Sequence, residues 1–216
     1  AEDASPDLTK PAINVQLAEE VAASFSIVFA GNIGKAQSCE TIIEAAKLLQ
    51  SVPAIKFYLV GSGSMADSVS ENIVDGRLKN VAMTGQVPAE DMSVIFASAS
   101  VLLLTLRDDA ALSSTIPSKL QSYLAAGKPV IASCNGEAAS VVTKANAGLA
   151  CPAGDASALA DAVLKLFQMT PEERVRLGEN GRAHFGAHYR LQSRVTELVT
   201  HFDDVVARHR CAERMA

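Results

Sequence analysis

Short apolar runs alternate with amphipathic stretches along most of this chain, from residue 25 onward. The runs end at a glycine or a small residue and contain little internal polar alternation, which is typical of strands buried on both faces. Strands of this kind separated by helical stretches indicate a parallel sheet with helices on both sides. The expected strands are Ser26–Ala30, Ile55–Val60, Val81–Thr84, Val101–Thr105, Val130–Ser133 and Gly148–Cys151.

The stretches between these runs show the spacing of amphipathic helices, and several begin with capping residues. Ser38 and Asp155 are expected to cap two of them, and Thr170 with Glu173 forms a capping-box pattern that opens a last helix. We therefore predict an α/β fold, a Rossmann-like doubly wound parallel sheet of about six strands. The expected helices are Ser38–Ser51, Met65–Asp75, Ala89–Ala97, Pro117–Ala126, Glu137–Lys144 and Asp155–Gln168.

The two ends of the chain differ from this regular middle. Residues 1–24 are mixed in character and contain Pro6 and Pro11, so we expect a linker with one helical turn around Gln16–Ala23. Residues 25–190 form the predicted Rossmann-like domain. Residues 191–216 read as a longer amphipathic C-terminal helix.

Composition excludes several classes of protein. The 216 residues are 49% hydrophobic and carry a net charge of −5, which supports a sizeable core and disfavours binding to nucleic acid. The longest apolar run, Val101–Leu106, is far shorter than the roughly 18 residues of a membrane span. The four cysteines, Cys39, Cys134, Cys151 and Cys211, lack zinc-ligand spacing and suit reduced thiols in the cytoplasm.

Four loops follow expected strands, where ligands bind to open parallel sheets. The first and second, Gly31–Lys35 and Gly61–Gly63, have glycines that would let a diphosphate or a nucleoside approach the backbone, although plain tight turns explain them as well. The third, Gly85–Pro88, could lie against a base. The fourth, Ser113–Lys119, gathers hydroxyls and a lysine at a helix N-terminus, which suits a phosphate but also ordinary capping.

Other chemistries find little support. The GxGxxG spacing of nicotinamide-cofactor enzymes and the phosphate-binding motif of nucleoside triphosphatases are absent. The histidines, His184, His188, His201 and His209, all lie in the C-terminal helices, away from the strand ends. Asp108 and Asp109 follow a strand but read as solvated loop acids, and there is no DxD pair, so we expect a metal-free site without a cofactor.

The segment Pro117–Ser133, together with Phe29–Gln37, Asn135–Ala139 and Gly148–Asp155, resembles the donor-binding domain of retaining GT-B glycosyltransferases of group 1, family 4. The resemblance is closest to bacterial enzymes that build surface polysaccharides, of the fucosamine and colanic-acid type. It covers roughly residues 1–190, and the first residues, Ala1-Glu2-Asp3, look like the hinge that follows the N-terminal domain in such enzymes.

This resemblance implies a nucleotide-sugar donor, with uridine diphosphate (UDP) as the nucleotide, held by this domain. A lipid-linked or saccharide acceptor would bind a missing N-terminal domain, which could bring the enzyme to a membrane, and this domain alone would not complete the reaction. Lys119 and Ser114 would act in catalysis. The donor-binding residues implied are Gly31, Asn32, Gly34, Lys35, Gly61, Ser62, Gly63, Gln86, Val87, Pro117, Ser118, Lys119 and Ser122.

The chain departs from the wider family at charged positions. Ser114 and Ser122 stand where the family has a pair of glutamates spaced EX7E, and Asn32 and Gln37 replace an Arg and a Lys of the first loop. We therefore expect backbone N–H groups, with Lys119 and Lys35, to stabilise the leaving diphosphate. An epimerase of UDP-N-acetylhexosamine and a non-catalytic nucleotide-binding or interaction module are the alternative interpretations.

Overall fold

The computed structural model describes residues 13–190, 195–196, 198–203 and 205. In this part of the chain six strands form one sheet in the order β3-β2-β1-β4-β5-β6, and all neighbours run parallel. The doubly wound arrangement predicted from the sequence is confirmed. The strands are β1 (Phe25–Ala30), β2 (Ile55–Val60), β3 (Val81–Gly85), β4 (Val101–Thr105), β5 (Val130–Ser133) and β6 (Gly148–Cys151).

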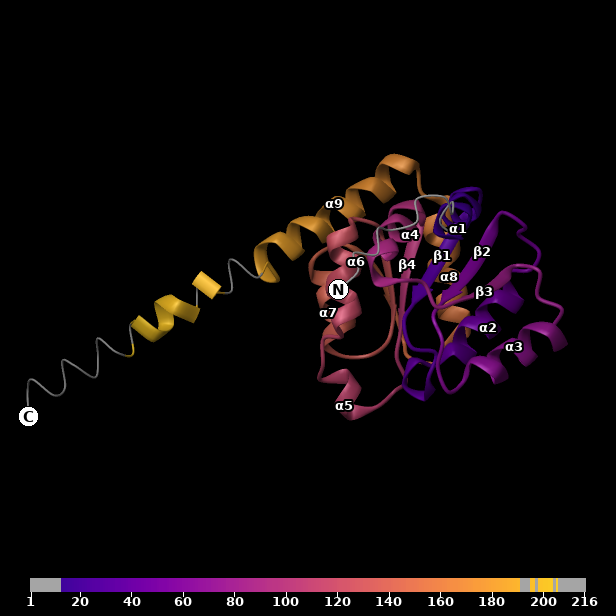
Figure 1. Cartoon of the computed structure of the whole chain (residues 1–216), viewed down its shortest axis with the longest axis horizontal. Coiled ribbons are helices and arrows are strands. Elements are labelled where there is room, and N and C mark those ends of the chain that lie inside the picture. Colours follow the sequence, from indigo (N-terminus) through magenta and orange to yellow (C-terminus); the bar gives the residue numbers. More distant parts are fainter. Residues whose placement is uncertain (1–12, 191–194, 197, 204, 206–216) are drawn as a thin grey trace, which may run out of the picture.

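Helices cover both faces of the sheet, as Figure 1 shows. One face is covered by α2 (Cys39–Leu48), α3 (Ala66–Asp75) and α8 (Ala156–Gln168). The other carries α1 (Ile13–Ala22), α4 (Met92–Ser98), α6 (Ser118–Ala126) and α7 (Glu137–Lys144), with α9 (Pro171–His188) packed on α6. Three short elements lie in the loops: η1 (Lys35–Gln37), η2 (Ala89–Asp91) and α5 (Ala110–Ser113).

The strand residues divide the core into two apolar clusters, one on each face of the sheet. In β1, Ile27 and Phe29 join the cluster beneath α2 and α8, whereas Val28 and Ala30 join the cluster beneath α1 and α6. All five residues of β4 are buried. Because both faces are covered, the central strands are mostly apolar on both faces, apart from the buried hydroxyls of Ser26, Thr105 and Ser133, which explains the apolar runs in the sequence.

The segment before β1 is more structured than the sequence pattern suggested. In place of a single turn within a linker, α1 is a helix of ten residues that lies against α4 and β1. Leu17, Ala18 and Val21 are buried, and the Tyr58 hydroxyl donates to the carbonyl of Glu20 at 2.9 Å. Residues 1–12 of the expected linker, and much of the C-terminal helix expected over 191–216, lie outside the described residues; 195–196, 198–203 and 205 are helical.

Two of the three predicted helix caps are confirmed. Thr170 and Glu173 form the reciprocal capping box that starts α9, and the Asp155 carboxylate accepts from the backbone N–H of Ala158 at 2.8 Å. Ser38 takes the expected N-cap position of α2, but its side chain accepts no hydrogen bond from the helix backbone. Ser38 lies in the left-handed region with φ of 46°, and its hydroxyl pairs with that of Thr41 at 2.9 Å.

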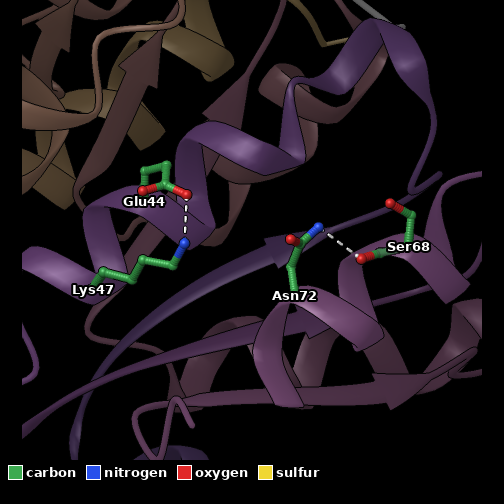
Figure 2. A network of polar contacts seen from close by, with 4 residues as sticks. All are labelled: Glu44, Lys47, Ser68 and Asn72. Carbon is green, nitrogen blue, oxygen red and sulfur yellow. Dashed lines mark hydrogen bonds and ion pairs between the residues drawn. The ribbon is translucent and has the colours of Figure 1, made fainter. Parts of the chain in front are cut away.

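Figure 2 shows two local polar contacts on the outer surfaces of α2 and α3. Glu44 and Lys47 form an ion pair of 2.7 Å within α2, and the Asn72 amide donates to the Ser68 carbonyl within α3. Exposed pairs of this kind add little to stability, so the fold depends on the two apolar clusters. In the part of the chain that the structure describes, no helix combines the length and apolar character needed to cross a bilayer.

Two glycines of α9 give a matched test of how this helix packs. A Cβ at Gly178 would lie 2.1 Å from the carbonyl oxygen of Gly127, whereas a Cβ at Gly186 meets nothing within 4 Å. We expect Gly178→Ala to lower the free energy of unfolding by about 1–3 kcal/mol, as overpacking does. Gly186→Ala should leave it unchanged or raise it by up to about 1 kcal/mol. Urea denaturation measures both, and equal stabilities would contradict the observed contact.

Candidate functional site

Three loops at the carboxyl end of the sheet are joined to one another through their backbones. The N–H of Gly31 donates to the carbonyl of Val60 at 2.8 Å, and that of Ile33 donates to Ser62 at the same distance. The N–H of Gly61 donates to Gly85 at 2.7 Å. The loops after β1, β2 and β3 therefore form one continuous surface, as the parallel order of these strands requires.

The glycines of the second loop are needed for this close packing. Gly61 has a φ of +139°, and a Cβ there would lie 1.9 Å from the carbonyl oxygen of Gly31. A Cβ at Gly63 would lie 2.4 Å from the carbonyl oxygen of Ile33. Neither contact is possible for a residue with a side chain, so both glycines have a structural reason beyond a plain tight turn.

The three loops and the start of α4 enclose a cavity of about 800 Å³. It brings together the predicted residues Gly31, Asn32, Gly61, Ser62, Gly63, Gln86 and Val87. At its rim the Gln86 amide donates to the Ser62 hydroxyl at 2.7 Å. Its wall also contains Met92 and Phe96, which the sequence analysis did not single out, because an apolar residue on a helix carries no signal that separates a cavity wall from the core.

Tyr123 of α6 separates β1 from β4 at this end of the sheet. The two strands pair at Ile27 with Val101 and at Val28 with Leu102. Beyond that, the Tyr123 hydroxyl accepts from the N–H of Ala30 at 2.9 Å and donates to its carbonyl at 3.2 Å. Burial raises the pKa of this phenol well above its ordinary value, so it stays neutral. The backbone pairing of β1 and β4 therefore ends after Val28 and Leu102, at the point where the strand order reverses and where open parallel sheets have a crevice.

The short helix η1 is held over the end of β4 by two hydrogen bonds. The Thr105 hydroxyl donates to the carbonyl of Gln37 at 2.5 Å, and the N–H of Arg107 donates to that of Ala36 at 2.9 Å. Arg107 is an exposed cation next to η1 that the sequence analysis also missed, since it belongs to none of the glycine-rich loops. The loop after β1 thus spans the crevice and connects the two halves of the sheet.

Lys119 of α6 reaches into this crevice from the other side. Its Nζ atom is buried without a hydrogen-bond partner and lies 4.3 Å from the centre of the Phe29 ring. A Cβ at Gly31 would be 3.0 Å from Nζ. Burial lowers the pKa of Lys119 to about 8, with the nearby Cys39 acting in the opposite direction. A buried ammonium without an acceptor is costly, so this cation is placed where an anion would be stabilised.

The remaining predicted residues lie in the loop after β1 and on α6. Gly34 is buried beside Asn32, and Lys35 is exposed on η1. Pro117 takes the N-cap position of α6, and Ser118 and Ser122 are exposed on that helix, one turn apart. These residues lie outside the set that lines the cavity.

The hydroxyls of Ser114 and Thr115, which precede α6 in the sequence, bond carbonyls of the short helix α5. The short helix α5 was not predicted, and the Ser114 hydroxyl donates to its Ala110 carbonyl at 3.0 Å. The Thr115 hydroxyl donates to the Leu112 carbonyl at 2.9 Å. Four-residue helices lack the periodicity that makes longer ones recognisable, so the hydroxyls were assigned to the wrong helix.

Asp108 and Asp109 have structural partners. The Asn135 amide donates to Asp108 at 2.8 Å, and the Asp109 carboxylate caps α5 by accepting from Ala111 and Leu112. Both residues are exposed, as expected of solvated loop acids, and they also accept local hydrogen bonds. His184 and His188 contact each other on α9 with ring centres 4.3 Å apart, and His209 lies outside the described residues. Within the described ranges, no three His, Cys, Asp or Glu side chains gather as a metal site would need.

The sequence was compared with those of known protein families. The sequence profile of the family described as glycosyl transferases group 1 matches residues 24–169. The chain belongs to this family. A probable glycosyltransferase of Pseudomonas aeruginosa, WbjE, is 27% identical over 143 residues, which cover 65% of this chain and 35% of that protein.

Solved structures show the same fold. HepE of Anabaena, solved in complex with UDP, superposes with a TM-score of 0.76 at 18% identity, over 91% of this chain and 54% of that one. A glycosyltransferase from Rickettsia africae gives a TM-score of 0.76 at 15% identity, over 91% of this chain and 52% of that one. The chain thus spans about a third of WbjE and about half of these two enzymes.

Tyr123→Phe tests the hydrogen bonds between the Tyr123 hydroxyl and the backbone of Ala30 at the end of β1. Removing the hydroxyl leaves the N–H of Ala30 buried without its partner, so we expect the free energy of unfolding to fall by about 1–3 kcal/mol. Chemical denaturation measures this change. Tyr58→Phe is the matched control, since the Tyr58 hydroxyl makes a single bond, as donor to Glu20, and its loss should cost less. A Tyr123→Phe variant as stable as the parent would contradict the role given to this hydroxyl.

Proposed function

We propose that this chain binds the UDP-sugar donor of a retaining glycosyltransferase. The observation that carries the proposal is the buried, unpartnered ammonium of Lys119 beside Gly31, a residue that also lines the cavity formed by the loops after β1, β2 and β3. A cation next to an open glycine-rich loop suits a diphosphate, and the adjoining cavity has the size and the largely apolar wall that a nucleoside needs.

The donor would lie across the two halves of the sheet. Its base would enter the cavity between Val87 and the α4 wall at Met92 and Phe96, with its edge near the Gln86–Ser62 pair. The diphosphate would follow the loop from Gly31 towards Lys119. The first turn of α6 would add the N–H groups that a helix N-terminus leaves free, which favour a negative charge.

The chemistry we propose is transfer with retention, in which the leaving diphosphate assists attack from the same face. Lys119 would stabilise the charge that develops on the diphosphate, the role that positively charged clamps serve in such reactions. A catalytic role for Ser114 stays a prediction, as does one for Lys35. A cytoplasmic role in bacterial polysaccharide synthesis is supported by the resemblance set out above.

The relatives support a uridine nucleotide. HepE has been solved with UDP and with UDP-glucose, and a pneumococcal O-GlcNAc transferase, GtfA, with UDP and GlcNAc. The acceptor, lipid-linked or saccharide, would bind the part of a complete enzyme that this chain does not span.

Lys119→Ala gives the direct test of the proposed site. Loss of the only cation buried beside Gly31 among the described residues should weaken UDP binding at least tenfold, about 1.4 kcal/mol, measured by titration calorimetry. Lys47→Ala is the matched control, because Lys47 is an exposed lysine on α2 whose ion pair is local. Equal affinity in the Lys119 variant and the parent would remove Lys119 from the site.

Activity assays separate the proposal from its alternatives. We expect the chain by itself to bind UDP or a UDP-sugar while transferring no sugar, since the acceptor site is assigned to a part that it does not span. Turnover by this chain alone would refute that division. Isomerised UDP-sugar from the full-length protein would favour the epimerase, and failure to bind any nucleotide would favour an interaction module.

A further inference from the structure

The surroundings of Lys119 lack the carboxylate that a buried lysine normally pairs with. Its Nζ atom makes no hydrogen bond, and its contact is the face of the Phe29 ring. The ionisable neighbour that acts on it is the buried thiol of Cys39. The acids after β4 are engaged elsewhere, Asp108 with Asn135 and Asp109 with α5. The ammonium therefore has no counter-ion in the described protein.

We propose that the diphosphate of the donor binds together with a proton, which Lys119 takes up from solvent. This inference rests on the proposed function, because it requires that the ligand be an anion beside Gly31. In the empty site the amine is desolvated without an acceptor, which favours its neutral form. A diphosphate next to Nζ supplies both charge and acceptors, which favours the ammonium. The proton that completes the ammonium comes from the buffer.

The affinity for the diphosphate depends on pH because the pKa of Lys119 differs between the free and the bound chain. The pKa of Lys119 in the empty site is about 8, and the diphosphate raises it in the complex. Below pH 7 the amine is already charged, so binding takes up little proton and the affinity is at its full value. Above pH 8 the amine must first be protonated, so the affinity falls as the pH rises.

Other titrating groups near the crevice do not reproduce this profile. Burial and the neighbouring Glu40 raise the pKa of Cys39 to about 11, so its thiol stays protonated up to pH 9.5. The Arg107 guanidinium is exposed next to η1, and the ionisable neighbour that acts on Lys119 is Cys39. The terminal phosphate of UDP loses its last proton at a pKa of about 6, below the range concerned. The Tyr123 phenol is held neutral by burial.

The first experiment measures UDP affinity by calorimetry between pH 7 and pH 9.5. With a pKa of about 8 in the empty site, the affinity should be about tenfold weaker at pH 9 than at pH 7. Lys119→Arg keeps a cation that does not titrate, so its affinity should stay flat over this range. Cys39→Ser removes the neighbouring thiol and should keep the tenfold decrease.

The second experiment counts the proton directly in the unmodified chain. Binding enthalpies at pH 8.5, measured in buffers of different ionisation enthalpy, should give an uptake of roughly three-quarters of a proton per UDP. UDP binding with no uptake and no pH dependence would overturn the inference while leaving the proposed function intact. Failure of the unmodified chain to bind UDP at any pH would overturn both.

Discussion

The carboxyl end of β1 has a neighbour on each side but pairs fully with only one of them. Towards β2 the two strands stay in register along their whole length, from Phe25 with Ile55 to Ala30 with Val60. Towards β4 the pairing stops early, and the Tyr123 hydroxyl occupies the backbone groups of Ala30. Because parallel strands connect through helices on opposite faces at this point, the loops diverge and leave room for a ligand. The loop surface, the cavity and the crevice that receives Lys119 all follow from this asymmetry.

The same constraint explains how a site for a diphosphate can exist on a chain with a net charge of −5. The positive charge is not spread over the surface but concentrated in one ammonium, which is shielded from water by Phe29 and the loop after β1. Shielding makes a single cation act more strongly on an anion than an exposed one does, since the local dielectric constant is low. It also makes the protonation of that cation depend on what lies beside it.

Much of the architecture could be predicted because it depends on local patterns. Strands buried on both faces leave apolar runs, and Thr170 with Glu173 leaves a capping box. What the sequence pattern missed depends on contacts between distant segments. The helix α1 owes its order to packing on α4, and Ser38 loses its cap to a left-handed turn. In the same way, the residues of the glycine-rich loops were recognised, whereas Phe96 in the cavity wall and Tyr123 beside Ala30 were not. Nothing in a helix sequence marks which residue faces a cavity or pairs with the backbone of a distant strand.

The site draws its groups from both halves of the sheet. The glycine-rich loops follow β1, β2 and β3, whereas Lys119 and Tyr123 come from the helix between β4 and β5. The two halves are joined along the sheet by only two paired positions of β1 and β4. A nucleotide that contacts both the loops and Lys119 would link the two halves of the sheet and would stabilise the short pairing between β1 and β4. Its occupancy would then be visible far from the ligand, as slower amide exchange along β1 and β4.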